Sequence, residues 1–338
     1  MVLVTGACGH IGNTLVRKLL DLGEKVRALV FPGEDTSSLD GLAVEQIHGD
    51  VCDRKSLDEA FTGADTVFHL AGMVSIIPGK KDLLYRVNVL GTRNIVDACL
   101  SHKVSRLIYT SSVHALPDLP KGMFISESSG FSTGTAFGEY GKSKAAATLE
   151  VIDGIKRGLD AVICCPSGVM GPNDYKPSKM GQCLMDFVSG KMRMSLDGGY
   201  DFVDVRDVAT GEIAAWKKGR TGETYILKGE KITVMQILSI AAYEEGVKPP
   251  KFSVPYFLAR IGAFFFTLFS RGKREPLLTT ESLSILRSNY NFKNEKTVSE
   301  LGYITRRLDE TIADTLRWFR ARGMIKGVMT KINVPASE

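Results

Sequence analysis

Residues 2–12, which read VLVTGACGHIG, decide the fold of this chain. A short apolar run, Val2–Thr5, leads directly into glycines at positions 6, 9 and 12, and the amphipathic segment Ile11–Leu20 follows. Gly6 permits a tight turn after a strand, Gly9 lets the backbone approach a pyrophosphate, and Gly12 lets the helix pack closely on the strand. The pattern predicts a strand–turn–helix unit that binds a dinucleotide at the helix N-terminus, and the alternative interpretation is a purely structural turn.

Further apolar runs repeat this strand–helix alternation along the first two-thirds of the chain. Most are continuous and rich in β-branched residues, which is typical of parallel strands buried on both faces. The predicted strands after the first are Val26–Val30, Val44–His48, Thr66–Leu70, Arg106–Thr110 and Ala161–Cys165. The predicted helices are Ile11–Leu20, with Gly23 as a stop, Asp82–Leu100 and Tyr140–Ile155. Together they predict an α/β fold with a doubly wound parallel sheet.

The sequence changes character after Pro166. Loops rich in Gly, Pro and Asp are predicted at Gly168–Pro177 and Asp197–Asp201, followed by a strand, Thr224–Leu227, and a helix that begins with the capping box Thr233-x-x-Gln236. Helices then dominate, and the last clear one is Asp309–Arg322. We therefore predict three parts. They are a dinucleotide-binding domain (1–165 plus about 200–228), a smaller mixed, mainly helical C-terminal substrate lobe (166–199 plus 229–330) and a tail (331–338).

The overall composition is that of an ordinary globular protein. The 338 residues correspond to about two domains, with 44% hydrophobic and 24% charged residues. These values exclude a disordered chain, a collagen-like repeat and a disulfide-stapled miniprotein. The formal net charge of +5 is not concentrated in one block, so we expect no nucleic-acid partner.

The cysteines and the apolar segments indicate a cytoplasmic protein. None of the six cysteines forms a Cys-x-x-Cys pair, so we predict no metal site and scattered, buried thiols in a reducing compartment. The N-terminus lacks the features of a signal peptide. The most apolar stretch, Phe252–Phe269, is interrupted by Pro255, Arg260 and Gly262, and it is too short for a membrane span, which needs about 20 residues.

A serine, a tyrosine and a lysine form the candidate catalytic set. Tyr140 and Lys144 are four residues apart, so they face the same way on a helix. A nearby ammonium favours the phenolate and is expected to lower the tyrosine's pKa, which lets the pair exchange a proton with a carbonyl or an alcohol. Ser112 follows the strand Arg106–Thr110 at the edge where α/β sheets bind ligands, and its hydroxyl suits a substrate oxygen.

These motifs resemble those of the extended short-chain dehydrogenases/reductases, within the broad NAD-dependent epimerase/dehydratase group. The resemblance covers about residues 1–320. The matching segments are Thr5–Gly12, Gly49–Val51, His69–Gly72, Asn88–Thr92, Tyr109–Ser112, Tyr140–Lys144, Pro166–Pro172, Phe202–Val208 and Leu301–Tyr303. Together they are specific for the fold and much less specific for the substrate.

The resemblance implies a Rossmann domain and a role for each matching residue. Tyr140 would be the acid/base, Lys144 its pKa partner and ribose ligand, and Ser112 the group that orients the substrate oxygen. Asn88 would either support a proton-relay water or be a packing residue of its helix. The residues implied in cofactor binding are Thr5, Gly6, Cys8, Gly9, His10, Ile11, Gly12, Phe31, Asp50, Val51, Leu70, Ala71, Gly72, Thr110, Tyr140, Lys144, Pro166, Gly168 and Val169.

The end of the second strand bears on the choice between NAD and NADP. An acid there pairs with the ribose hydroxyls, whereas an arginine receives the 2′-phosphate. Val30 and Phe31 occupy these positions, so neither decisive group is present. The missing carboxylate removes repulsion against a phosphate, and hydroxyls at Thr36, Ser37 and Ser38 follow, so we favour NADP over NAD.

The residues near the expected substrate favour an apolar ketone or secondary alcohol. Ser112 is followed by Val113-His114-Ala115 rather than by the acidic pair of related dehydratases, which argues against elimination. Most of the substrate-side positions are apolar, and a sugar would leave its hydroxyls unpaired there. These positions are Met73, Val74, Ser75, Ile76, Val113, His114, Met170 and Tyr175, although a lone histidine such as His114 is more often a structural residue. The chain is similar to the dihydroflavonol-reductase-like and 3β-hydroxysteroid-dehydrogenase-like branches.

Several alternatives remain open on the sequence. A sugar-nucleotide epimerase with bound NAD and a non-catalytic dinucleotide sensor share the fold. Segment 252–274, with its phenylalanines and the basic residues Arg271, Lys273 and Arg274, is a core helix, a lid or a weak contact with a membrane interface. The resemblance also implies a homodimer through the helices at about 82–100 and 140–155, with a monomer as the alternative.

Overall fold

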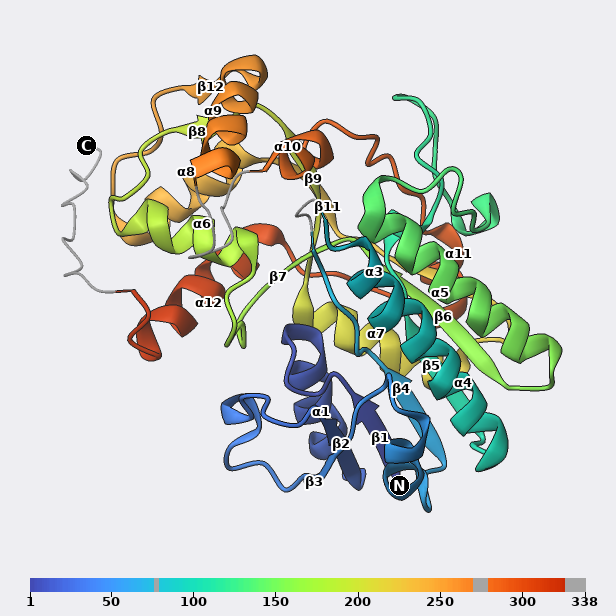
Figure 1. Cartoon of the computed structure of the whole chain (residues 1–338). Helices are drawn as coiled ribbons and strands as arrows, with labels where there is room; N and C mark the ends of the chain where they lie inside the picture. Colours follow the sequence, from blue (N-terminus) through green and yellow to red (C-terminus); the bar gives the residue numbers. More distant parts are fainter. Residues whose placement is uncertain (76–78, 270–278, 326–338) are drawn as a thin grey trace.

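A parallel seven-stranded sheet forms the centre of the molecule. The computed structural model describes residues 1–75, 79–269 and 279–325, without the side chains of 263–269 (Figure 1). The strand order is β10-β6-β5-β4-β1-β2-β3, and every neighbouring pair is parallel. The strands are β1 (Val2–Thr5), β2 (Val26–Val30), β3 (Glu45–His48), β4 (Thr66–His69), β5 (Arg106–Thr110), β6 (Ala161–Pro166) and β10 (Thr224–Leu227). The predicted strands and the doubly wound α/β class are confirmed.

Helices cover both faces of this sheet (Figure 1). One face carries α1 (His10–Asp21), α7 (Val205–Lys218) and α11 (Glu295–Leu301); the other carries α2 (Asp58–Phe61), α4 (Gly91–Ser101) and α5 (Gly138–Lys156). The side chains of β5 alternate between the two cores. Leu107 and Tyr109 pack in the core that includes α4 and α5, whereas Ile108 packs with α1 and α7. The continuous apolar strands thus follow from burial on both faces.

A smaller lobe is built from two short sheets and several helices. The three-stranded sheet has the order β11-β9-β7, and β12 pairs with β8. The strands are β7 (Gly168–Met170), β8 (Ser195–Leu196), β9 (Gly199–Asp204), β11 (Glu230–Thr233) and β12 (Ser253–Val254). The helices are α6 (Lys179–Val188), α8 (Val234–Glu245), α9 (Tyr256–Phe269), α10 (Thr280–Ile285) and α12 (Leu308–Ala321), and the capping box of Thr233 and Gln236 begins α8 as predicted.

The two loops predicted after Pro166 are wrong in part, because each also contains strand residues. β7 lies within the expected loop Gly168–Pro177, and β9 begins within Asp197–Asp201. All six residues of β9 are buried, because it is the central strand between β7 and β11. Its stability comes from partners more than 25 residues away in sequence, which no local pattern of Gly and Asp reveals.

The helix predicted at Asp82–Leu100 is three consecutive helical segments. α3 (Lys81–Leu84) runs into a π-helical turn (Tyr85–Leu90), and α4 continues from Gly91. A π turn inserts an extra residue into a helix and often marks a functional site. The remaining short turns are the 3₁₀ segments Ser37–Leu39, Arg54–Leu57, Val113–Ala115 and Glu127–Ser129.

Some predicted features fall outside the described residues. These are Ile76, the side chains of the phenylalanines from 264 to 269, the basic residues at 271, 273 and 274, and the tail 331–338. Within the described ranges, no helix is both long enough and apolar enough to cross a membrane. The six cysteines are free thiols, and all but Cys52 are buried.

The junction of β1 and α1 depends on two glycines. Gly6 has a φ of +70°, a left-handed conformation that L side chains rarely adopt. A Cβ at position 12 would lie 2.0 Å from the Gly6 carbonyl oxygen, because the first turn of α1 lies directly against the loop. The close packing expected from the glycine spacing is therefore present.

We expect Gly12→Ala to lower the free energy of unfolding by about 2 kcal/mol, since a methyl group there overpacks backbone against backbone. Urea denaturation followed by circular dichroism measures this loss. Gly9→Ala is the matched control. Its Cβ would lie 3.2 Å from the same carbonyl oxygen, so we expect a smaller loss. Equal unfolding midpoints for Gly12→Ala and the parent would contradict the packing argument.

Candidate active site

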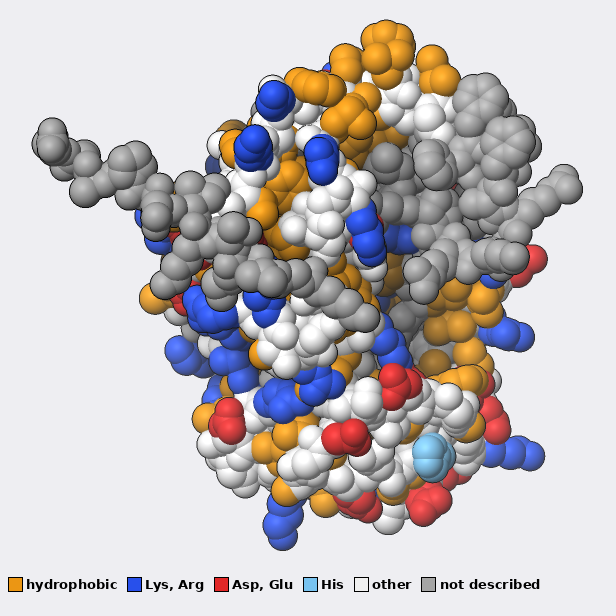
Figure 2. All heavy atoms as spheres, turned by 90° about the vertical axis from the view of Figure 1, so that its left-hand side faces the viewer, with side chains coloured by type: hydrophobic (Ala, Val, Ile, Leu, Met, Phe, Trp, Pro, Cys, Tyr) orange, Lys and Arg blue, Asp and Glu red, His pale blue; other side chains and the backbone are white. Residues whose placement is uncertain are grey.

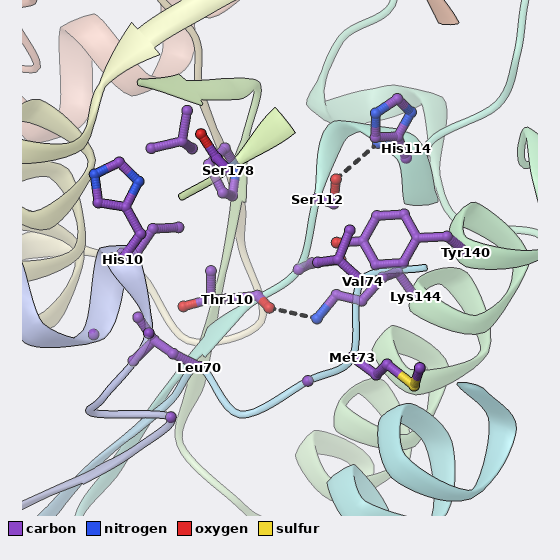
Figure 3. Close-up of a pocket in the computed structure, with 18 of the residues that line it drawn as sticks. His10, Leu70, Met73, Val74, Thr110, Ser112, His114, Tyr140, Lys144 and Ser178 are labelled. Atoms are coloured by element: carbon purple, nitrogen blue, oxygen red, sulfur yellow. Dashed lines mark hydrogen bonds between the residues drawn. The ribbon is translucent and has the colours of Figure 1, made fainter. Parts of the chain in front are cut away.

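A cavity of about 400 Å³ lies at the carboxyl ends of the central strands (Figure 3). The large sheet supplies most of its wall, and the small lobe closes it with residues from the loop before α6 and from α10. The lining residues are Gly6, Gly9, His10, Ile11, Gly12, Leu70, Gly72, Met73, Val74, Thr110, Ser111, Ser112, His114, Tyr140, Lys144, Pro166, Ser167, Val169, Ser178 and Ile285. Such a crevice outside the strand ends is where open α/β sheets bind ligands.

The glycine loop forms one end of this cavity. Gly9 is the N-cap of α1 and has no side chain to accept from the first amides of the helix. No acidic residue lies in the first turn, so the N-terminus of α1 remains positive where it meets the cavity. A Cβ at Gly6 would meet the backbone of Ala71 at 2.6 Å, so the loop lies directly on the end of β4. This geometry suits a pyrophosphate, and the site therefore fits a nicotinamide dinucleotide.

The side chain of His10 connects the glycine loop to the small lobe. Its Nε2 lies 2.9 Å from the Pro172 carbonyl oxygen, and its Nδ1 lies 3.9 Å from Asp174 Oδ1. Nearby, Asn13 Nδ2 donates to the Asn173 carbonyl at 3.0 Å. These contacts join residues 172–174, which follow β7, to the start of α1. The small lobe and the large sheet therefore meet at the cavity.

Seven predicted cofactor residues do not line the cavity. They are Thr5, Cys8, Phe31, Asp50, Val51, Ala71 and Gly168. The hydroxyl of Thr5 is fully buried and lies 2.7 Å from His69 Nδ1, so it joins β1 to β4 behind the loop. Phe31 is 55% exposed at the end of β2, and Asp50 accepts from the Cys52 amide at 2.8 Å.

The three candidate catalytic residues meet in the cavity. Figure 3 shows Ser112, Tyr140 and Lys144 on one side, with His10 and Ser178 on the opposite side. Ser112 follows β5, and its Oγ accepts from the His114 amide at 3.2 Å, which fixes the 3₁₀ turn after the strand. Tyr140 and Lys144 lie one turn apart in α5. A Cβ at Gly141 would lie 2.5 Å from the His114 carbonyl oxygen, so the glycine lets α5 approach Ser112 closely.

Lys144 is held inside the protein by a carbonyl and an aromatic ring. Its Nζ donates to the Thr110 carbonyl oxygen at 2.7 Å (Figure 3). The same Nζ lies 4.6 Å from the centre of the Tyr109 ring. The side chain is buried, and this burial lowers the pKa of Lys144, while the neighbouring Tyr140 opposes the shift. The amine of Lys144 therefore lies at the wall of the cavity, where it is poorly solvated.

The pKa of Tyr140 differs from the expectation. Burial of the phenol raises its pKa above the ordinary value of 10, while the Lys144 charge and a hydrogen bond with Ser112 lower it. The predicted net lowering is therefore wrong for the structure as it stands, because loss of hydration outweighs the ammonium. The neutral phenol is favoured near neutral pH, and that form can donate a proton to a carbonyl oxygen.

Asn88 lies in the π turn and fixes the segment that follows β4. Its Oδ1 accepts from the Met73 amide at 2.7 Å, and its Nδ2 donates to the Met73 carbonyl at 3.0 Å and to Ser143 Oγ at 2.9 Å. Asn88 is 1% exposed and does not line the cavity. Both amide hydrogens of its side chain are donated to protein groups. Of the two roles expected for Asn88, these contacts match the role of a packing residue.

The structure separates the predicted substrate residues into two groups. Met73, Val74 and His114 line the cavity, whereas Ser75 is buried beside it. Val113, Met170 and Tyr175 do not line it. The side chains of Val113 and Met170 pack into the core instead. The ring of Tyr175 packs on Trp318 at 5.1 Å and its hydroxyl accepts from Arg17 at 3.0 Å, so it faces away from the cavity.

Several residues of the cavity were not predicted from the sequence. Ser178 is the N-cap of α6, a signal that the sequence shows, but nothing local indicates that it faces a cavity. Ile285 reaches the site from α10, far away in the chain. Tyr200 of β9 does not line this cavity but lies behind His114, with stacked rings 5.5 Å apart and its hydroxyl 3.3 Å from Nε2. Ser111 and Ser167 complete the missed set.

A buried carboxyl group lies behind the catalytic set. Glu212 of α7 is fully buried. Its Oε1 accepts from the Thr110 hydroxyl at 2.5 Å, whereas Oε2 has no hydrogen-bond partner among the described residues. Burial raises the pKa of Glu212 to about 7, against the opposing effects of Thr110 and Lys144. Thr110 thus contacts both groups, because its carbonyl accepts from Lys144.

This chain is similar in sequence to a known family and to several known proteins. A sequence model described as the NAD dependent epimerase/dehydratase family matches residues 2–227. A protein of Methylococcus capsulatus named sterol demethylase protein B is 38% identical, with 96% of this chain and 99% of that one covered. A Synechocystis protein with the provisional name dihydroflavonol 4-reductase is 33% identical, with 96% and 95% covered.

A mammalian relative and a solved structure extend these similarities. The mouse sterol-4-alpha-carboxylate 3-dehydrogenase, decarboxylating, is 27% identical, with 94% of this chain and 90% of that one covered. The crystal structure of gox2253 superposes with a TM-score of 0.84 at 34% identity, with 96% of this chain and 99% of that chain covered. The similarity therefore includes both lobes.

The buried carboxyl group predicts a specific pH dependence. Unfolded Glu212 has a pKa of about 4.3. Its folded pKa of about 7 is higher. The native state therefore binds the additional proton between these values, and its stability falls as the pH rises through them. Relative to Glu212→Gln, the wild-type protein should lose on the order of 3 kcal/mol of unfolding free energy between pH 4.5 and pH 7.

Urea denaturation of both proteins at pH 5, 6, 7 and 8 gives this difference, since the other titrating groups are common to both. A constant difference across the series would show that Glu212 does not titrate in this range.

Proposed function

The chain belongs to the NAD dependent epimerase/dehydratase family, and on this premise we propose that it interconverts an apolar ketone and a secondary alcohol. The observation that carries the proposal is the convergence of Ser112, Tyr140 and Lys144 on a cavity that also receives the N-terminus of α1. Proton-exchanging groups lie at one end of this cavity and a pyrophosphate cradle at the other. That arrangement is what hydride transfer to a carbonyl requires.

Each catalytic residue has a distinct role in the proposed reduction. The Ser112 hydroxyl donates a hydrogen bond to the carbonyl oxygen and orients it. Tyr140 transfers its phenolic proton to that oxygen as negative charge develops. The Lys144 ammonium stabilises the phenolate that remains. A bound nicotinamide cofactor supplies the hydride, and alcohol oxidation uses the same groups in the opposite direction.

The lining of the cavity supports an apolar substrate. Met73, Val74 and Ile285 supply apolar surface, and the described lining contains no Arg, Asp or Glu. A sugar nucleotide carries a diphosphate that guanidinium groups bind well, so this lining suits it poorly. Relatives named for sterol demethylation and for sterol-4-alpha-carboxylate 3-dehydrogenation support a lipophilic substrate of sterol type.

The end of β2 supports use of both nicotinamide cofactors, with NADP preferred. Neither Val30 nor Phe31 carries a charge that discriminates. Ser38 is 2% exposed and its hydroxyl donates to the Cys8 carbonyl, so only Thr36 and Ser37 remain of the hydroxyls expected near a 2′-phosphate.

We expect kcat/KM for NADPH to exceed that for NADH by less than about tenfold, because neither Val30 nor Phe31 carries a charge that discriminates between the two. Initial rates with a single ketone and each reduced cofactor measure the ratio. A preference for NADH of more than about a hundredfold would refute this part of the proposal.

The reaction is tested with cyclic lipophilic ketones, 3-keto sterols and a UDP-hexose, each with NADH and NADPH. We expect oxidation of the reduced cofactor with the ketones. Epimerisation of the UDP-hexose without net redox change would overturn the proposal in favour of an epimerase.

The role of Tyr140 is tested by Tyr140→Phe. Removing the transferable proton should lower kcat by about a thousandfold, while the Kd for the cofactor changes by less than about twofold. Fluorescence titration measures the Kd. Tyr85→Phe is the control, because Tyr85 is 48% exposed and does not line the cavity, and it should retain full activity. Undiminished turnover by Tyr140→Phe would remove the tyrosine from the mechanism.

A further inference from the structure

An exposed apolar surface lies on the small lobe, at the end remote from the large sheet. It consists of large hydrophobic side chains from the start of β8, the start of β12 and α9, and we call it the apolar face. Its members are Met194, Phe252, Phe257, Leu258 and Ile261, which are 45%, 57%, 63%, 48% and 53% exposed, respectively. Figure 2 shows hydrophobic side chains gathered at the top of the molecule in this region.

The fold places these side chains together and keeps them exposed. In the parallel pair of β8 and β12, Ser195 lies opposite Ser253, so the preceding Met194 and Phe252 are neighbours. In α9, positions 257, 258 and 261 share one face of the helix. The opposite face is anchored, because Ala259 is 7% exposed and packs on Leu283 of α10. The exposed side chains of α9 therefore lie on a helix that is packed against the lobe.

Cations border the apolar face. The exposed Arg193 and Lys251 precede the two strands at equivalent positions, and the exposed Arg260 lies within α9. None of the three is ion-paired to a carboxylate in the described part of the chain. Asp197, the acid next to β8, pairs with Arg287 at 2.8 Å instead. Figure 2 shows Lys and Arg side chains directly below the hydrophobic group.

We propose that the apolar face docks on the surface of an anionic lipid bilayer. The apolar side chains match the acyl chains of such a surface. The bordering cations, which have no carboxylate partner among the described residues, match its negative headgroups. A second copy of the chain is a poorer occupant, since a two-fold contact would bring the same unpaired cations together. Contact with the interface requires no membrane-spanning helix.

The position of the apolar face also bears on the substrate, and this step rests on the proposed function. Leu283 of α10 packs under α9, while Ile285 of the same short helix lines the cavity. One short helix thus separates the lipid-facing surface from the candidate active site. A lipophilic ketone dissolved in the bilayer would reach the enzyme from this side.

The test is flotation of the whole protein with phosphatidylcholine vesicles, with and without about a third of phosphatidylserine. We expect binding to the anionic vesicles, at least tenfold stronger than to the neutral ones, and release at high salt. Phe257→Ser/Leu258→Ser should lower the partition coefficient at least tenfold. Arg193→Gln/Lys251→Gln should lower it about 25-fold, or fivefold for each cation.

The control is Ile304→Ser, which removes an apolar side chain that is 83% exposed on a different part of the surface. It should bind vesicles like the parent. Light scattering of the same variants tests the alternative occupant. Absence of vesicle binding, or dimers that Phe257→Ser/Leu258→Ser converts to monomers, would overturn the proposal. Flotation requires no turnover, so failure of the proposed enzyme activity would not be confused with failure of docking.

Discussion

The burial of one amine beside one phenol is the constraint on which the rest of the site depends. The Lys144 side chain is buried, and its amine contacts the Thr110 carbonyl and the face of the Tyr109 ring. A buried ammonium is costly, so both of these partners must be in position when α5 packs on the sheet. Gly141 makes that packing possible, because a side chain at this position would collide with the His114 carbonyl.

The same burial strengthens the preference of Tyr140 for its neutral form. Loss of hydration raises the pKa of the phenol, and the nearby amine only partly offsets it. In the proposed reduction, this phenol is the group that supplies the proton to the carbonyl oxygen. Behind it, Thr110 joins Lys144 to the buried carboxyl group of Glu212, so both faces of the sheet contribute to the electrostatics of the cavity.

Local sequence patterns predicted what depends on backbone geometry and periodicity. The glycine spacing at 6, 9 and 12 predicted the β1–α1 junction, and the apolar runs predicted the strands of the large sheet within about two residues. The spacing of Tyr140 and Lys144 placed them on one helical face, and the position of Ser112 after a strand placed it at the ligand-binding edge of the sheet. The small lobe was harder, since β7 and β9 contain Gly and Asp and exist only because they pair with each other and with β11.

What the sequence determined by itself was therefore the strand–helix alternation of the doubly wound sheet, the glycine turn after β1 and the shared helical face of Tyr140 and Lys144, because each depends on residues close together in the chain. Ser112 is distant from Tyr140 in the chain, and it was identified from its place after a strand. The tertiary structure alone decided which side chains face the cavity. In the folded chain, Met170 packs in the core and Tyr175 packs on Trp318, so neither lines the cavity. Ile285 and Ser178 line it instead. The tertiary structure also placed Glu212 behind Thr110 and reversed the expected pKa shift of Tyr140, because desolvation depends on everything that surrounds a group in space.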